Sequence, residues 1–101
     1  MSTTEPTASL DENSLVVRSG HQTHRELSDE FVILGIKTGR YFSVEEVGAA
    51  IWRALQKPTT VAELCEQIVA KYNTSHVQCR ADVIAFLEEL RDEELISLIE
   101  K

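Results

Sequence analysis

The chain has 101 residues, of which 43% are apolar and 27% are charged, and its net charge is −7. This is an ordinary globular composition, which excludes the collagen-like, low-complexity and wholly disordered classes. Only residues 31–60 carry more basic than acidic side chains. Because binding to a polyanion depends on clustered Lys and Arg, we expect neither nucleic acid nor a membrane surface as a partner.

The expected setting is the cytoplasm. No apolar run approaches the roughly 18 residues that a membrane span needs. The first 13 residues lack the basic and apolar regions of a secretory signal. In a reducing compartment, Cys65 and Cys79 are expected to be free thiols.

The first part of the chain predicts a tail and then short strands. Residues 1–13 are polar and rich in Ser and Thr, so we expect a disordered tail ahead of a single domain over residues 14–101. Leu15–Val17 predicts a short strand that ends at the turn signal Ser19–Gly20. The segment Thr23–Leu27 either extends this strand or forms a return.

The clearest local signal is a β-hairpin. Phe31–Ile36 is rich in β-branched and aromatic residues, which favour strands. Lys37–Gly39 supplies a turn, and Arg40–Val44 predicts a second strand. Two such runs joined by a three-residue loop with glycine are typical of an antiparallel hairpin.

Three helices follow the hairpin. The pattern Ser-x-x-Glu occurs at Ser43–Glu46 and the equivalent Thr-x-x-Glu at Thr60–Glu63, and each predicts a capping box at a helix start. The first helix stops before Pro58, since proline cannot continue the hydrogen-bond ladder. The third helix is expected over residues 75–92, and Leu95–Ile99 is either a strand or an extended segment packed on the core.

These elements predict an α+β, winged-helix-like fold, with a small three-stranded antiparallel sheet followed by three α-helices. Each helix has a single apolar face, so the helices must pack on one another and on one face of the sheet. Winged-helix domains and several peptide-binding modules share these parts. The fold alone therefore does not choose a function.

No cluster in the sequence predicts catalysis, a metal or a cofactor. His21 and His24 form an H-x-x-H pair, but no further ligands converge on it to make a zinc site. Cys65 falls on the apolar face of the second helix, which favours a packed thiol. His76 and Cys79 share a helix surface but have no orienting group or oxyanion site. We therefore expect a protein that is not an enzyme by itself.

Four segments, in this order and spacing, resemble the PqqD-like family, also called RiPP precursor peptide recognition elements. The segments are Thr38–Phe42, Val47–Trp52, Thr60–Leu64 and Asp82–Leu90. The likeness spans about residues 14–99 and is greatest to the free-standing leader-binding proteins of lasso-peptide biosynthesis. This chain departs from the family pattern at Glu45, where members commonly carry Asn, and at Glu94, where they usually carry Gly.

The resemblance implies a non-catalytic function. Such domains bind the leader segment of a ribosomally made precursor peptide and present the peptide to maturation enzymes, here a leader peptidase and a downstream cyclase. The leader would add as an extra strand to Arg40–Val44, in a groove closed by helix 76–92. The residues expected to bind it are Arg40, Tyr41, Phe42, Ser43, Val44, Arg80, Val83, Ile84, Leu87 and Arg91.

The third helix carries charges of both signs that are expected to contact the leader. A row with helical spacing would form an apolar floor with a cation at each end, suited to acidic leader residues: Arg80, Ile84, Leu87 and Arg91. Carboxylates on the same helix would steer basic leader residues: Asp82, Glu88 and Glu89.

Several placements stay open at this point. Either Tyr41 or Phe42 can face the ligand, and Val83 and Leu87 belong either to the core or to the groove. Trp52 lies beside the apolar face of the first helix, where it can contact the core or a partner.

Two other functions remain as alternatives. The family likeness also covers a peptide carrier for pyrroloquinoline quinone (PQQ) biosynthesis or for another radical enzyme. A winged-helix DNA-binding regulator would place the third helix in the major groove, which requires a basic face. Residues 76–94 carry six acidic side chains against Arg80 and Arg91, so the sequence disfavours that regulator.

Overall fold

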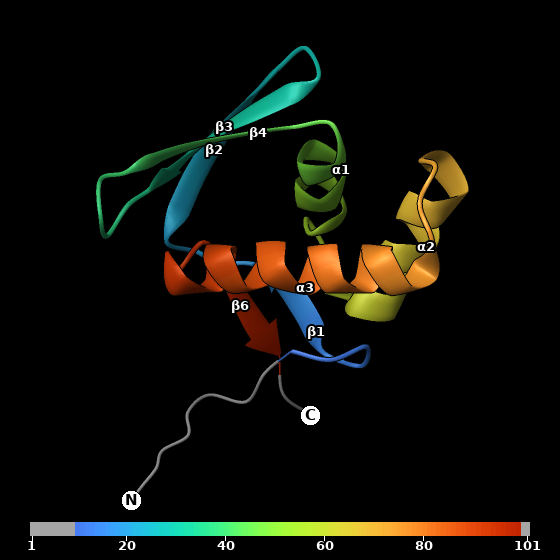
Figure 1. The fold of residues 1–101 in the computed structure, drawn as a ribbon. Coiled ribbons are helices and arrows are strands. Elements are labelled where there is room, and N and C mark those ends of the chain that lie inside the picture. The colour runs from blue at the N-terminus through green and yellow to red at the C-terminus, as the bar shows by residue number, and fades with distance from the viewer. Residues whose placement is uncertain (1–9, 100–101) are drawn as a thin grey trace, which may run out of the picture.

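The computed structural model describes residues 10–99, which form two antiparallel sheets and three helices (Figure 1). The strands are β1 (Leu15–Arg18), β2 (Gln22–Leu27), β3 (Glu30–Gly35), β4 (Tyr41–Glu45), β5 (Thr59–Thr60) and β6 (Ile96–Ile99). The helices are α1 (Val47–Ala54), α2 (Val61–Lys71) and α3 (His76–Asp92). The predicted α+β class is confirmed, while the winged-helix likeness stays a prediction.

The first sheet has the strand order β2-β3-β4. β3 and β4 form the predicted hairpin, in which Phe31 pairs with Val44 and Ile33 pairs with Phe42. Gly39, in the connecting turn, has a φ of 72°, which glycine adopts without steric cost. β2 is a return strand, and it pairs with β3 rather than with β1. β2 and β4 are therefore the two edges of this sheet.

The second sheet, with the order β5-β1-β6, joins segments that are far apart in the sequence. Leu15 pairs with Thr60 on one side and with Ile99 on the other. Of the two possibilities for residues 95–99, the structure makes residues 96–99 a strand. The sheet as a whole has no local sequence signature, because β5 has two residues and both strand pairings are long-range.

Of the two capping boxes predicted from sequence, one is present at a helix start and one is not. Thr60 and Glu63 form a complete box, since each side chain accepts the backbone N–H of the other residue, at 3.1 and 2.9 Å. The box predicted at Ser43–Glu46 is wrong, because β4 continues through Glu45. Ser43 instead donates its hydroxyl hydrogen to the carboxylate of Glu30 on β3. Glu46 occupies the N-cap position of α1 with a φ of 55° and no side-chain cap.

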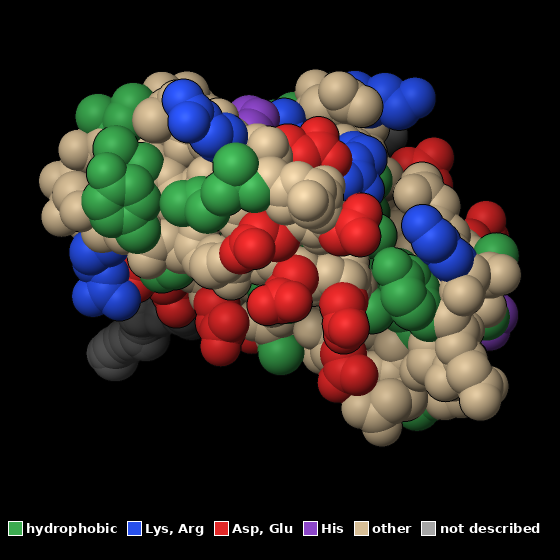
Figure 2. Space-filling model, turned by 90° about the horizontal axis from the view of Figure 1, so that it is seen from above, with side chains coloured by type: hydrophobic (Ala, Val, Ile, Leu, Met, Phe, Trp, Pro, Cys, Tyr) green, Lys and Arg blue, Asp and Glu red, His purple; other side chains and the backbone are tan. Residues whose placement is uncertain are grey.

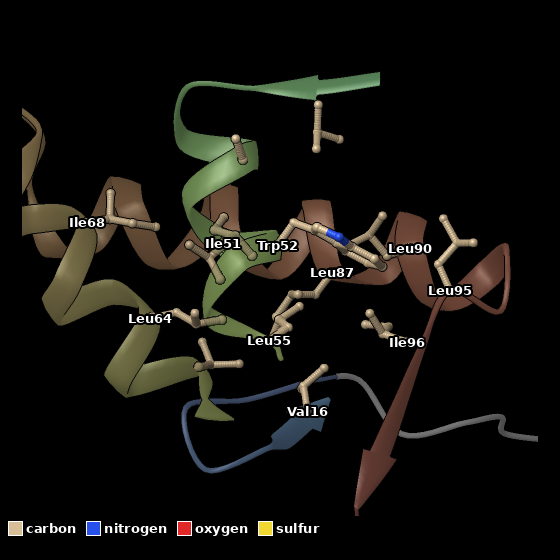
Figure 3. Close-up of a cluster of buried hydrophobic side chains, with 14 of the residues drawn as sticks. Val16, Ile51, Trp52, Leu55, Leu64, Ile68, Leu87, Leu90, Leu95 and Ile96 are labelled. Carbon is tan, nitrogen blue, oxygen red and sulfur yellow. The ribbon is translucent and has the colours of Figure 1, made fainter. Parts of the chain in front are cut away.

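A cluster of buried apolar side chains lies between the helices and both sheets (Figure 3). Trp52 of α1 points into this cluster and is 0% exposed, so it is a core residue. Val16 of β1, Leu55 beyond the end of α1, Leu87 of α3 and Leu95 are equally inaccessible to solvent. The core therefore connects the second sheet to α1 and α3, and it fixes where α3 lies relative to β4.

Residues 10–13, the described part of the predicted tail, are held to the domain by one buried side chain and by hydrogen bonds. Leu10 is 4% exposed and belongs to the core. The backbone N–H of Ala62 donates to the carbonyl oxygen of Glu12 at 3.0 Å, and the N–H of Asn13 donates to Asp11 Oδ1 at 2.8 Å. Residues 1–9 of the predicted tail lie outside the described residues.

Candidate functional site

Strand β4 has an edge that no other described strand covers. Along an antiparallel strand, residues that bond to the neighbour alternate with residues whose N–H and C=O groups point away from it. The N–H of Gly35 donates to the carbonyl of Arg40 at 2.9 Å, and the register then makes Phe42 and Val44 the β4 residues that bond to β3. The residues whose backbone groups point to the free edge are Tyr41, Ser43 and Glu45.

The side chains of β4 alternate between the two faces of the sheet. Val44 is buried and Phe42 is half-buried, on the face that meets the helices. Tyr41 is 71% exposed on the opposite face. The inward-facing aromatic residue of this strand is therefore Phe42, and Tyr41 faces outward.

A hollow of about 420 Å³ lies between β4 and the C-terminal half of α3, and we call it the β4–α3 groove. Its lining residues are Arg40, Phe42, Ser43, Val44, Phe86, Glu89, Leu90, Asp92 and Glu93. The free backbone groups of β4 thus border a concave surface with a partly apolar floor. An extended peptide placed along this edge would contact both β4 and α3.

A second hollow, of about 390 Å³, extends along α3 toward its N-terminal half, and we call it the α1–α3 hollow. Phe86 lines both hollows. Gly48 of α1 permits this arrangement, because a Cβ there would lie 3.4 Å from Phe86 Cζ and 3.3 Å from Val44 Cβ. The two hollows therefore meet at Phe86, beside Gly48 of α1.

The β4–α3 groove is lined by none of the α3 residues that the sequence predicted for it, namely Arg80, Val83, Ile84, Leu87 and Arg91. Val83 and Leu87 are 1% and 0% exposed because they pack into the core. Arg80 lies near the start of α3 and pairs with Glu12. Ile84 packs against the margin of the core. Val83 also lines the α1–α3 hollow, and contact of these residues with a leader stays a prediction.

The predicted flank and the flank that lines the groove differ by a rotation about the helix axis. At 3.6 residues per turn, two positions separated by two residues point about 200° apart, so rows through Asp82 and through Ile84 lie on opposite flanks of α3. The flank that faces the hollows contains Asp82, Phe86, Glu89 and Glu93. Both rows have the same spacing, so periodicity cannot choose between them. The available signal was Gly48, which leaves room for an aromatic side chain on α3.

Arg40 joins the start of β4 to the end of α3. Its Nε lies 3.5 Å from Glu93 Oε1, and its guanidinium lies 5.6 Å from the centroid of the Phe42 ring. Within the described residues, the carboxylates of Glu89 and Asp92 form no ion pair. The helix side of the groove is therefore acidic.

Other residues considered for chemistry occupy structural positions. Cys65 and Cys79 are buried and free, and burial raises the pKa of Cys65 to about 11, with the Cys79 thiol adding to the effect. His24 lies edge-on to Trp52, with ring centroids 5.6 Å apart, and its Nε2 is 3.1 Å from Arg18 Nη1. In the described part of the chain, no group of three or more His, Cys, Asp and Glu side chains is placed to hold a metal ion. None of the described helices combines the length and apolarity needed to cross a bilayer.

Comparison with known proteins identifies the family. The model described as coenzyme PQQ synthesis protein D (PqqD) matches residues 30–96, which is more than half of the chain. The chain belongs to the PqqD family. The matched range includes β4 and α3, so both walls of the groove belong to the family's common part. No curated protein matches the chain.

Two solved structures share the fold. The structure of TbiB1 in complex with the TbiA(beta) leader peptide has a TM-score of 0.77 and 28% sequence identity, and the match covers 84% of this chain and 99% of TbiB1. A lasso peptide synthetase B1 complexed with the leader peptide has a TM-score of 0.73 over 81% of this chain and 96% of its own. At 15% identity, that second likeness shows the fold alone.

One departure from the family pattern has a visible backbone basis. Glu94 follows α3 with a φ of 60°, at the position where the sequence resemblance implies a glycine. Its carboxylate pairs with Lys37 at 2.8 Å, and this pairing lowers the pKa of Glu94. Glu94 thus adopts the left-handed backbone conformation that a glycine would adopt after α3, and its side chain also contacts the hairpin turn at Lys37.

Proposed function

We propose that this protein binds the leader segment of a ribosomally synthesised precursor peptide, of the lasso-peptide class, as an added strand on β4. The observation that carries the proposal is the free edge of β4, which borders the β4–α3 groove. The likeness to TbiB1, whose structure holds a leader peptide, supports the same assignment.

The edge offers main-chain affinity with little demand on sequence. Tyr41, Ser43 and Glu45 direct their N–H and C=O groups outward, and each hydrogen bond formed there contributes about 0.5–1.5 kcal/mol net. Peptide side chains opposite Phe42 and Val44 would enter the groove, because residues directly opposite each other share a face. Those side chains supply the specificity that main-chain bonding lacks.

The proposed role is delivery rather than chemistry. The groove presents aromatic, aliphatic and carboxylate side chains, and its one guanidinium is paired with Glu93. A protein that holds a leader in this way must pass the peptide to other enzymes. We propose that these are a leader peptidase and, downstream, a cyclase.

A second candidate is a peptide carrier of the PQQ-biosynthesis type that serves a radical enzyme, and the description of the matching family model favours it. Both candidates use the same groove, so they differ in the peptide that binds. The acidic character of α3 argues against the DNA-binding alternative, since its carboxylates would face phosphates.

The test is a titration of the ¹⁵N-labelled protein followed by amide hydrogen exchange. The probes are the synthetic TbiA(beta) leader peptide, the synthetic leader of a short precursor encoded beside this protein's own gene, and the precursor peptide of PQQ synthesis. Bound leader should protect the amides of Tyr41 and Ser43, while those of Gln22 and Glu26, on the opposite edge, should keep their exchange rates. Tight binding without protection at β4 would contradict strand addition, and preferential binding of the PQQ precursor would select the second candidate.

A further inference from the structure

The side of α3 that faces the two hollows alternates carboxylates with an aromatic ring. Asp82 lines the α1–α3 hollow, Phe86 lines both hollows, and Glu89 and Glu93 line the β4–α3 groove. Asp92 also lines the groove. Figure 2 shows acidic side chains gathered across the middle of the face seen from above. The wall opposite the strand edge is therefore negatively charged on both sides of Phe86.

The protein itself balances little of this charge. Arg40 is the basic residue among those that line the groove, and it is engaged by Glu93 at 3.5 Å. Glu89 and Asp92 have no ion-pair partner within residues 10–99. A bound peptide would displace water from these carboxylates, which raises the cost of leaving them unpaired.

The spacing of the carboxylates suits an extended chain. Glu89 and Glu93 are four residues apart on α3, which places their Cα atoms about 6 Å apart along the helix axis. Side chains on one face of a strand recur about every 6.7 Å. Lys and Arg have long apolar stems that can lie along Phe42 and Phe86 while the charged group reaches a carboxylate.

We propose that the β4–α3 groove selects leader peptides that carry Lys or Arg at positions facing α3, opposite Phe42 and Val44. The inference rests on the proposed function, and it adds the charge class of the ligand. The sequence allowed both signs, since the row with Arg80 and Arg91 at its ends suits acidic leader residues and the carboxylates of the same helix suit basic ones. The flank that faces the groove carries the carboxylates.

The test uses a display library of random linear peptides selected on the intact protein. Retained peptides should be enriched in Lys and Arg over the unselected library, and their enrichment should fall as ionic strength rises, since salt screens exposed charges. Retained peptides without this bias, or with an acidic bias, would overturn the charge preference and leave leader binding standing. A library from which no peptide is retained would contradict the proposed function itself.

Matched variants locate the charge that matters. The double substitution Glu89→Gln with Asp92→Asn replaces two groove carboxylates. It should lower the affinity for the selected basic peptides about three- to tenfold. The control, Glu66→Gln with Glu88→Gln, removes the same charge from residues that do not line the groove, and it should change affinity less than about twofold. Equal effects of the two pairs would show a response to net charge alone and would overturn the assignment to the groove.

A charge reversal sharpens the result. Glu89→Lys should shift the selected peptides from basic toward acidic side chains at the groove-facing positions. Continued selection of basic peptides by the Glu89→Lys protein would contradict direct pairing at this residue.

Discussion

The two edges of the β2-β3-β4 sheet have the same backbone pattern but different surroundings. On β4, the inward side chains Phe42 and Val44 leave the β4–α3 groove open. On β2, two inward side chains are engaged by the protein's own arginines. His24 contacts Arg18 at 3.1 Å, and Glu26 pairs with Arg53 of α1 at 2.6 Å.

The comparison gives a physical reason to expect peptide binding at one edge and not at the other. Both edges offer free N–H and C=O groups, but a peptide on β2 would meet a face on which Arg18 already covers Trp52, with its guanidinium 4.9 Å from the indole centroid. A peptide on β4 would meet a hollow with an acidic wall. The neighbouring helix, more than the strand, therefore distinguishes a binding edge from a structural one.

The largest expected effect comes from Trp52→Ala, which removes the buried indole on which Arg18 and His24 lie. The indole is fully buried, and such truncations cost about 3–5 kcal/mol. Urea denaturation should show this loss. Phe42→Ala, on the β4 side, should cost less stability, because Phe42 is half-buried, and should instead weaken peptide binding. Comparable losses of stability would contradict the division between a structural edge and a binding edge.

A pair of proline substitutions tests the two edges directly. Ser43→Pro removes an outward N–H from β4 and should weaken leader binding by about tenfold or more, measured by calorimetry. Glu26→Pro removes the equivalent N–H from β2 and should leave affinity unchanged. Circular dichroism of both variants checks that the sheet persists, since proline is tolerated on strand edges. Equal affinities of the two variants would place the peptide elsewhere.

The junction between β4 and α1 carries backbone strain that a glycine should relieve. Glu46 has a φ of 55° and a ψ of −120°, without a side-chain cap, and a non-glycine residue in such a region costs about 1–3 kcal/mol. Glu46→Gly should therefore stabilise the protein by about 1 kcal/mol after the entropy cost of glycine. The adjacent Glu45→Gly, within β4, should destabilise it. Thermal unfolding of both variants should show a higher Tm for Glu46→Gly and a lower Tm for Glu45→Gly than in the natural protein.

The smallest effect is a pH dependence at the β2 edge. Burial, with a contribution from Arg18, lowers the pKa of His24 below its ordinary value of 6.5. The unfolded chain therefore takes up the proton more readily, so the stability contributed by neutral His24 is present above pH 6.5 and is lost as the pH falls below it. The side chain is largely exposed, so we expect Tm to fall by about 1–2 °C more in the natural protein than in His24→Gln between pH 8 and pH 5.

Local patterns predicted the parts of this fold that local physics determines. The β3–β4 hairpin and the Thr60–Glu63 cap depend on residues close in sequence, and both are present. The second sheet depends on β1 meeting residues 59–60 and 96–99, and those pairings follow from packing of the whole chain. At the start of α1, the Ser-x-x-Glu pattern was overridden because Ser43 bonds to Glu30 across the sheet.

The residues predicted for the site match the lining of the β4–α3 groove on the strand side and differ from it on the helix side. The alternation of side chains along β4 places Phe42 and Tyr41 on opposite faces of the sheet. It does not say which of the two faces inward, and the burial in the structure answers that question. On α3, apolar residues occur on more than one flank: Ile84 lies outside the groove and Phe86 lines it. Which flank meets β4 depends on how Trp52 and Leu87 pack α3 against α1, and helical periodicity carries no information about that rotation.

The pairing of β1 with β6 determines where other proteins can be attached without loss of the proposed activity. Leu15 and Ile99 are directly opposite in the second sheet, and in Figure 1 both ends of the described chain emerge on the side away from β4. An affinity tag, a surface linker or a fused enzyme joined at either end would therefore leave the β4–α3 groove open. This geometry allows the protein to be immobilised by either end in the selection experiments.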